Sequence, residues 1–167
     1  MISPIVPVRR LTSADVALYR EIRLEALRAH PDAFASTYEK EVAFAEDFLR
    51  ERLDGSPVFA GFDGDSIVGM AGFYRLDGEK VRHKGVLWGM YVRPSARGKG
   101  YSASLAEAVI DHARGCVEIL SLSVVTGNDA ARRLYERMGF VAYGIERRAL
   151  KVGETYLDEV LMAMPVA

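Results

Sequence analysis

The segment from Met90 to Ser102 constrains the fold more than any other part of this sequence. An apolar run ends at Val92, and Pro94 prevents the chain from continuing as a fully paired inner strand. Gly98 and Gly100 then alternate with two cationic residues, and a pattern with helical spacing follows. The segment therefore predicts a strand, a short glycine-rich turn and the start of a helix in direct succession.

This turn has the features of an anion-binding site. The first turn of a helix carries free backbone N–H groups and a partial positive charge. Glycines at positions 98 and 100 let an anion approach the backbone without a Cβ in the way, and Arg97 and Lys99 add full charges. An ordinary strand-to-helix turn can have the same composition, so the segment alone leaves both interpretations open.

The composition predicts one soluble domain over residues 1–167. This is the length of a single domain, and 50% of the residues are hydrophobic, which is enough for a substantial core. Because 22 Lys and Arg stand against 23 Asp and Glu, nothing in the overall charge indicates nucleic acid or a membrane surface as a partner. Anion binding must therefore come from a local site.

Cysteine content and the N-terminal residues predict a cytoplasmic protein. Cys116 is the only cysteine, so no intramolecular disulfide can form, and we expect this thiol to be buried and inert. Residues 1–10 contain two prolines and no apolar signal core, and no run approaches the ~20 apolar residues of a membrane span. His30, His83 and His112 lack the spacing of metal ligands, so no metal is expected.

The order of the predicted elements indicates an α/β fold. Turn signals and hydrophobic periodicity divide the sequence into strand-like segments at 6–10, 58–62, 67–76, 81–92, 117–125, 140–150 and 156–164, and helix-like segments at 12–30, 37–53, 101–115 and 128–139. Gly89 inside a strand suggests a bulge. We expect a mixed, mostly antiparallel central sheet of about seven strands with helices on both faces.

Two motifs in this order resemble those of the GCN5-related N-acetyltransferase (GNAT) superfamily. The acetyl-CoA signature of that family is Arg or Gln, two residues, Gly, one residue, then Gly or Ala. It corresponds here to the run from Arg97 to Ser102, in which Tyr101 and Ser102 are mild departures. The second motif corresponds to residues 128–140, with an initial Asn, a Tyr within the helix and a final Gly-Phe. Together they make the resemblance specific, and the element order extends it over nearly the whole chain.

The resemblance implies direct transfer of an acetyl group from acetyl-CoA to a primary amine of a small molecule or an amino-acid-like acceptor, in a ternary complex. The CoA pyrophosphate would lie over the turn, and the thioester carbonyl would meet a backbone N–H at the bulged strand end. The residues that would bind acetyl-CoA are Met90, Tyr91, Val92, Arg97, Gly98, Lys99, Gly100, Tyr101, Ser102 and Asn128. Asn128 would bond the pantetheine arm, although a helix N-cap calls for the same residue.

Tyr135 resembles the general acid of the family, which protonates the departing thiolate. A phenol with a pKa of about 10 would donate to a thiolate whose thiol titrates at about 8.5, so the transfer is slightly uphill. A Tyr on an apolar helix face is also typical of core packing. No carboxylate occurs in residues 81–92 to act as a base, so we expect deprotonation of the amine through water held by Ser121, Ser123 and Thr126.

The acceptor contacts expected from the resemblance are Glu39, Glu41, Trp88 and Ser123. The two glutamates begin the second predicted helix, where a solvated acidic helix start explains them equally well. Two alternative functions stay open, which are an acyl-CoA-binding module without turnover and a protein or peptide N-acetyltransferase. A homodimer is compatible with the resemblance, because relatives often form one.

Overall fold

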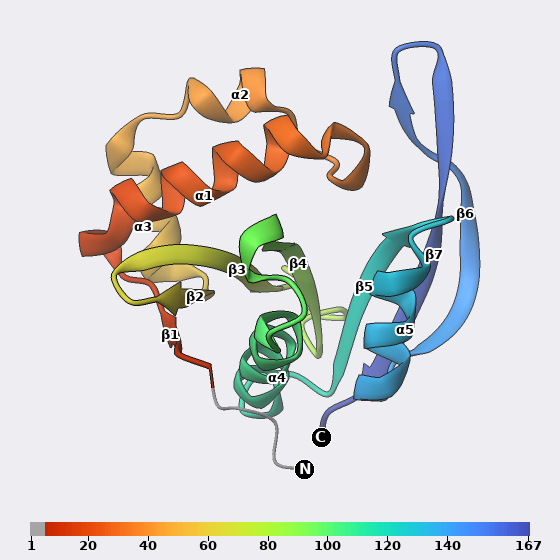
Figure 1. Cartoon of the computed structure of the whole chain (residues 1–167). Coiled ribbons are helices and arrows are strands. Elements are labelled where there is room, and N and C mark those ends of the chain that lie inside the picture. Colours follow the sequence, from red (N-terminus) through yellow and green to blue (C-terminus); the bar gives the residue numbers. More distant parts are fainter. Residues whose placement is uncertain (1–5) are drawn as a thin grey trace.

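The chain folds around one central sheet in the computed structural model, which describes residues 6–167 (Figure 1). Residues 1–5, part of the segment inspected for a signal, lie outside the described residues. The strands are β1 (Val8–Arg10), β2 (Val58–Asp63), β3 (Ser66–Arg75), β4 (Lys84–Val92), β5 (Ile119–Val125), β6 (Val141–Val152) and β7 (Thr155–Pro165). The helices are α1 (Val16–Ala29), α2 (Tyr38–Val42), α3 (Glu46–Gly55), α4 (Tyr101–Arg114) and α5 (Asp129–Met138), with short 3-10 turns η1 (Ser13–Asp15), η2 (Pro31–Ala33) and η3 (Pro94–Ala96).

The sheet has seven strands in the order β1-β2-β3-β4-β5-β7-β6. Every neighbouring pair is antiparallel except β4 and β5, which are parallel. Parallel strands need a long crossover connection, and α4 provides it between β4 and β5. The expected mixed, mostly antiparallel sheet is therefore confirmed.

Helices cover both faces of this sheet. On one face α1 and α3 contribute Tyr19, Ile22 and Leu53 to a core that includes Met70 of β3. On the other face lie α4 and α5, whose core residues are Leu105, Ala106, Val109, Ile110, Leu134 and Tyr135. The two layers are visible in Figure 1, where the last hairpin, β6–β7, extends beyond the rest of the sheet.

The single helix predicted over residues 37–53 is wrong, because two helices occupy this region. Ala45, in an extended conformation, is the N-cap of α3 and separates it from α2. The break lets α2 turn Glu41 toward α1, while Leu49 and Leu53 of α3 are buried in the core. Hydrophobic spacing alone does not reveal such a change of axis.

The expected burial of Cys116 is also wrong, since this cysteine is exposed. Helix α4 ends at Arg114, and Cys116 lies in the turn after it, with its Sγ 3.4 Å from Nε2 of His112. The next residue, Val117, is buried instead. The chain thus re-enters the core one residue later than expected.

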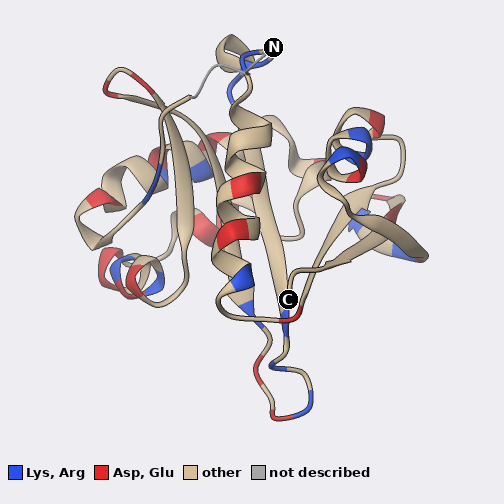
Figure 2. Cartoon of the chain, turned by 90° about the horizontal axis from the view of Figure 1, so that it is seen from below, with Lys and Arg blue, Asp and Glu red and all other residues tan. Residues whose placement is uncertain are grey.

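Lys and Arg residues and Asp and Glu residues are spread over the helices and loops (Figure 2). In the part of the chain that the structure describes, no helix is long and apolar enough to cross a membrane. Within residues 6–167, no three His, Cys, Asp or Glu side chains gather closely enough to hold a metal ion.

Candidate functional site

The sheet opens where β4 and β5 separate (Figure 1). Their parallel pairing runs only from Lys84 opposite Ile119 to Val86 opposite Ser121. Beyond Val86 both strands continue without pairing to one another. Ligands of open α/β sheets bind beyond the carboxyl ends of such strands, so this gap is the natural place for a site.

The bulge expected from Gly89 lies beside this gap. The register between β3 and β4 shifts from Gly72 opposite Trp88 to Met70 opposite Tyr91, so β4 carries an extra residue. Gly89 has a φ of 69°, in the left-handed region. A Cβ at this position would make a tight contact of 3.1 Å with Cε of Met70, the end of a flexible side chain, so the bulge depends on glycine mainly for its conformation.

Three adjoining hollows follow the gap. The turn-side hollow, of about 600 Å³, lies toward the glycine turn, and the α1-side hollow, of about 410 Å³, lies toward α1. A central hollow of about 110 Å³ lies between them. It shares Met90, Asn128 and Tyr135 with the turn-side hollow, and it shares Trp88 and Ser123 with the α1-side hollow. The three hollows therefore adjoin one another along the gap, and together we call them the cleft.

The glycine turn leaves its backbone accessible. Gly98 and Gly100 have φ values of 77° and 96°, and a Cβ on either residue would meet no atom within 4 Å. Gly100 is the N-cap of α4, a helix of 14 residues, and Lys99 between the glycines is exposed. The predicted strand, turn and helix start are thus present, with free space in front of the helix terminus.

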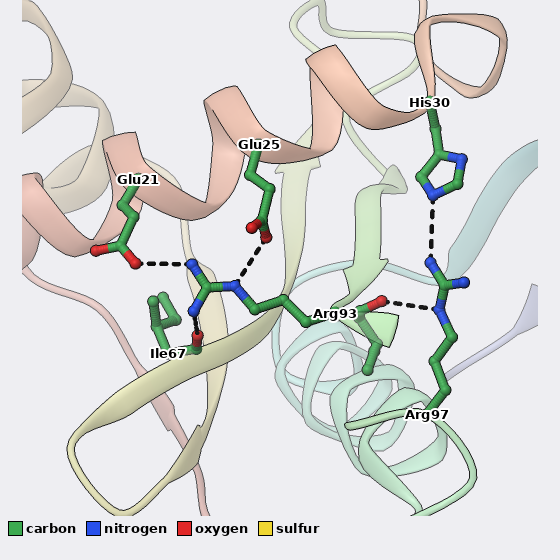
Figure 3. A network of polar contacts seen from close by, with 7 residues as sticks. Glu21, Glu25, His30, Ile67, Arg93 and Arg97 are labelled. Atoms are coloured by element: carbon green, nitrogen blue, oxygen red, sulfur yellow. Dashed lines mark hydrogen bonds and ion pairs between the residues drawn. The ribbon is translucent and has the colours of Figure 1, made fainter. Parts of the chain in front are cut away.

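Arg97 holds this turn in place (Figure 3). Its Nε donates to the carbonyl oxygen of Val92 at 3.0 Å, and its Nη2 lies 3.2 Å from Nε2 of His30. The guanidinium therefore ties the turn to the end of β4 and to the residue that follows α1. Part of it also lines the turn-side hollow, together with Ser102.

Arg93 anchors the same segment to α1 and was missed by the sequence analysis. Its Nε donates to Glu25 at 2.8 Å, its Nη2 to Glu21 at 2.7 Å and its Nη1 to the carbonyl oxygen of Ile67 at 2.7 Å (Figure 3). Burial opposes the charge, but the two carboxylates more than offset it and raise the pKa of Arg93. All of these partners lie far from Arg93 in the sequence, so no local pattern indicated them.

Tyr135 and Asn128 both border the cleft from α5. The Tyr135 side chain is buried, and burial raises the pKa of its phenol above the ordinary value. Its ring packs edge-on against Phe140. Asn128 caps α5, since its side chain accepts a hydrogen bond from the Ala131 N–H at 3.3 Å. The core and N-cap interpretations therefore hold, and both residues also line the turn-side and central hollows.

Tyr91 and Tyr101 differ in their relation to the cleft. The Tyr101 ring packs over Gly61 in the core, and its hydroxyl donates to the carbonyl oxygen of Phe62 at 2.6 Å. Only the backbone of Tyr101 is left to face the turn. Tyr91 lines the turn-side hollow, where burial and the nearby Glu25 raise the pKa of its phenol.

The four expected acceptor residues lie in different places. Trp88, Ser123 and Glu41 border the α1-side hollow, but Glu41 is buried and paired with Arg23, so a solvated acidic helix start does not describe it. Glu39 is exposed and lines a separate hollow of about 920 Å³ between α2 and the tip of the β6–β7 hairpin. The structure thus brings three of the four together.

Glu159 of β7 is a carboxylate at the α1-side hollow that the sequence analysis missed. It is half-buried, and burial together with the neighbouring Glu146 raises its pKa, while the Ser123 hydroxyl acts in the opposite direction. A carboxylate base was expected within residues 81–92, where none occurs. Antiparallel pairing places Glu159 opposite Val125 of β5, and this register was not evident from the sequence.

The fold and the cleft agree with a comparison against protein families. Residues 18–140 match the model of the acetyltransferase (GNAT) family. The match extends over well more than half of the chain, which therefore belongs to this family. The resemblance inferred from the two motifs is confirmed.

Individual relatives match shorter parts of the chain. It is 37% identical over 89 residues to the N-alpha-acetyltransferase RimI of Mycobacterium tuberculosis, which covers 53% of this chain and 54% of that protein. It is also 32% identical over 128 residues to a mycothiol acetyltransferase of Geodermatophilus obscurus. This match covers 72% of this chain and 41% of that protein. The chain thus spans about half the length of the curated relatives it matches.

A solved structure extends the likeness to the whole fold. The yncA structure of Salmonella typhimurium, which contains its cofactor acetyl-CoA, superposes with a TM-score of 0.81 over 98% of this chain and 95% of that chain. The two sequences are 22% identical. At this level the likeness shows the shared fold alone.

Proposed function

We propose that the chain is an acetyl-CoA-dependent N-acetyltransferase that acts directly on a primary amine of a small-molecule or amino-acid-like acceptor. The observation that carries this proposal is the row of adjoining hollows along the gap between β4 and β5, which extends from the glycine turn to a hollow lined by charged side chains. A donor and an acceptor that enter from opposite ends would meet at the bulge. Direct transfer in a ternary complex requires this kind of mutual positioning.

The turn fits a CoA pyrophosphate. The open space at Gly98 and Gly100 allows a phosphate to approach the N–H groups at the start of α4, and Lys99 adds an exposed charge. Arg97 is already engaged with Val92, so we assign it the positioning of the turn. Acetyl-CoA bound here would supply an activated acyl group as a thioester.

The bulge supports a place for the thioester carbonyl. Gly89 and Met90 lie where β4 has left its regular pairing, and both border the central hollow. A fixed backbone N–H aimed at the negative charge that develops on a carbonyl oxygen can contribute a few kcal/mol, roughly, to transition-state stabilisation. We assign this role to the backbone of the bulge.

The two proton transfers are assigned to different residues of the cleft, because Glu159 borders the α1-side hollow and Tyr135 borders the central and turn-side hollows. As the amine nitrogen bonds to the acyl carbon, it loses a proton, and we assign Glu159 as the final acceptor through water held by Ser123. A pKa raised toward neutrality suits a carboxylate for this task. As the carbon–sulfur bond breaks, the thiolate takes a proton from the Tyr135 hydroxyl. The raised pKa of this phenol makes the transfer uphill, so positioning must favour it.

The proposal is tested by measuring thiol release from acetyl-CoA with a panel of small amines, amino acids and peptides, alongside calorimetric binding of acetyl-CoA. Acetylation of small amines or amino acids supports it. Binding of acetyl-CoA with no acetylated acceptor identifies a binding module without turnover. Acetylation of peptides alone identifies a peptide N-acetyltransferase, the alternative that the likeness to RimI favours.

A further inference from the structure

Arg23, in the middle of α1, has a buried donor without a partner. The side chain is 6% exposed, and its Nε and Nη2 donate to the two carboxylate oxygens of Glu41 at 2.9 and 2.8 Å. Its third nitrogen, Nη1, has no hydrogen-bond partner among the described residues. The only other buried side-chain atom in this condition within residues 6–167 is the Tyr19 hydroxyl, which does not line the cleft. A buried donor left unpaired costs free energy, and a ligand oxygen would recover it.

The free nitrogen lies next to the bulge. Nη1 is 3.5 Å from the position that a Cβ on Gly89 would occupy, and Arg23 lines the α1-side hollow. The guanidinium lies over two aromatic rings, 5.3 Å from the centroid of Phe34 and 5.1 Å from that of Trp88. Its orientation is therefore fixed by Glu41 and by two rings, and a ligand would find the donor already in place.

Arg52 adds a second cation to the same hollow. Its guanidinium lies 4.9 Å from the centroid of Trp88, and it lines the α1-side hollow. Among the described residues, no carboxylate lies within ion-pair distance of Arg52, and its charge acts on Glu41 only at longer range. The charged side chains that line the hollow are Arg23, Lys40 and Arg52 against Glu41 and Glu159, which leaves one positive charge in excess. Guanidinium groups are well suited to carboxylates.

We propose that Arg23 and Arg52 bind a carboxylate of the acceptor, so that the amine substrate is a free amino acid. This inference rests on the proposed function and narrows it. The short approach of Nη1 to Gly89 means that the carboxylate and the reacting amine lie close together in the substrate, as in an α-amino acid. An amine at a peptide N-terminus has an amide at that distance and offers no charge to the two arginines.

The test compares each standard amino acid with its carboxamide and with the corresponding decarboxylated amine, in the thiol-release assay with acetyl-CoA. We expect kcat/KM for the best amino acid to exceed that of its carboxamide by about tenfold or more, since a hydrogen bond to a charged group is lost. Equal or faster acetylation of the carboxamide or the amine overturns the carboxylate site and leaves the N-acetyltransferase intact. Acetylation of peptides but not of amino acids also overturns it.

Two variants locate the effect. Arg52→Met should raise KM for the amino acid about tenfold and should lower kcat/KM for the carboxamide by a clearly smaller factor. Arg50→Met on the same helix is the matched control, because Arg50 pairs with Glu46 and lies outside the hollow. An Arg52→Met enzyme with an unchanged preference for the amino acid overturns the proposal. Arg23→Lys, which keeps the charge opposite Glu41, should also reduce the preference for the carboxylate.

A binding measurement separates this inference from turnover. Trp88 is the only tryptophan of the chain, so the intrinsic fluorescence at the indole wavelength reports on the hollow. Titration with the panel should change the fluorescence for amino acids at lower concentrations than for their carboxamides. If amino acids change the fluorescence at lower concentrations but none is acetylated in the thiol-release assay, the carboxylate site is supported and the proposed activity is refuted. No difference between the two titrations refutes the carboxylate site.

Discussion

Arg23 and Glu41 hold α1 and α2 together through two hydrogen bonds of 2.9 and 2.8 Å, with both side chains almost fully buried. The pair crosses 18 residues of sequence. It accompanies the division of residues 37–53 into two helices, which leaves Glu41 of α2 facing α1. Removal of one partner leaves a buried charge without compensation, and this has a measurable cost.

Glu41→Gln should lower the free energy of unfolding by about 3 kcal/mol, the lower end of the cost of breaking a buried ion pair. Urea denaturation followed by circular dichroism measures it. The control is Glu46→Gln, which removes an exposed pair with Arg50 on one helix and should change stability by less than about 0.5 kcal/mol. Equal effects of the two substitutions would show that the buried pair adds nothing.

The same pair predicts a pH dependence of stability. Burial opposes ionisation of Glu41, but Arg23 more than offsets this and lowers its pKa in the folded state. The contribution is therefore present above the pKa of an unfolded glutamate and is lost as the pH falls through the lower folded value. As the pH falls from about 6 to about 3, the free energy of unfolding should therefore decrease less in Glu41→Gln than in the wild type. Urea titrations across this pH range measure the difference.

Gly100→Glu should abolish binding of acetyl-CoA, because a side chain and a negative charge enter the space in front of α4. Isothermal calorimetry measures the affinity. Gly64→Glu is the matched control, since Gly64 also has a positive φ and open space around it but lies in the β2–β3 turn. An unchanged affinity of Gly100→Glu would place the pyrophosphate elsewhere.

Tyr135→Phe should lower kcat by about tenfold or more while the affinity for acetyl-CoA stays nearly the same, because only the proton donor is removed. Steady-state kinetics and calorimetry on the same preparation separate the two effects. Tyr143→Phe, at an exposed position of β6, serves as the control. A normal kcat would exclude Tyr135 as the acid.

Glu159 must be ionised to accept a proton, so the rate should rise with pH through a pKa above that of an ordinary glutamate. Glu159→Gln should remove this limb of the pH–rate profile and lower kcat/KM. Glu146→Gln should shift the limb to lower pH, because the Glu146 charge raises the pKa of Glu159. If the limb stays at the same pH in Glu146→Gln, or is still present in Glu159→Gln, the titrating group is not Glu159.

The sequence was sufficient for the fold because the signals that determine it are local. Gly89, Gly98 and Gly100 mark a bulge and a turn that only glycine adopts easily, and each has a positive φ in the structure. The paired motifs were sufficient for the family. The break at Ala45 was missed because helical spacing continues on both sides of it.

The site was predictable only in part. The backbone elements around Met90 and Asn128 follow from local motifs, and both residues line the cleft. Arg23, Arg93 and Glu159 were missed because their roles depend on partners more than 15 residues away, or on the register of β7 against β5. A sequence pattern read along the chain contains no information about such contacts.

Helix α1 contacts both ends of the cleft. Glu21 and Glu25 bind Arg93 beside the glycine turn, while Arg23, between them in sequence, projects to the α1-side hollow. The distance between the contact with Arg93 and the Arg23 side chain is therefore set within one rigid helix, and it does not depend on the length of any loop. Insertions in the η2 loop or in the β6–β7 hairpin can reshape the entrance for new acceptors while the alignment of the two reacting molecules stays constant.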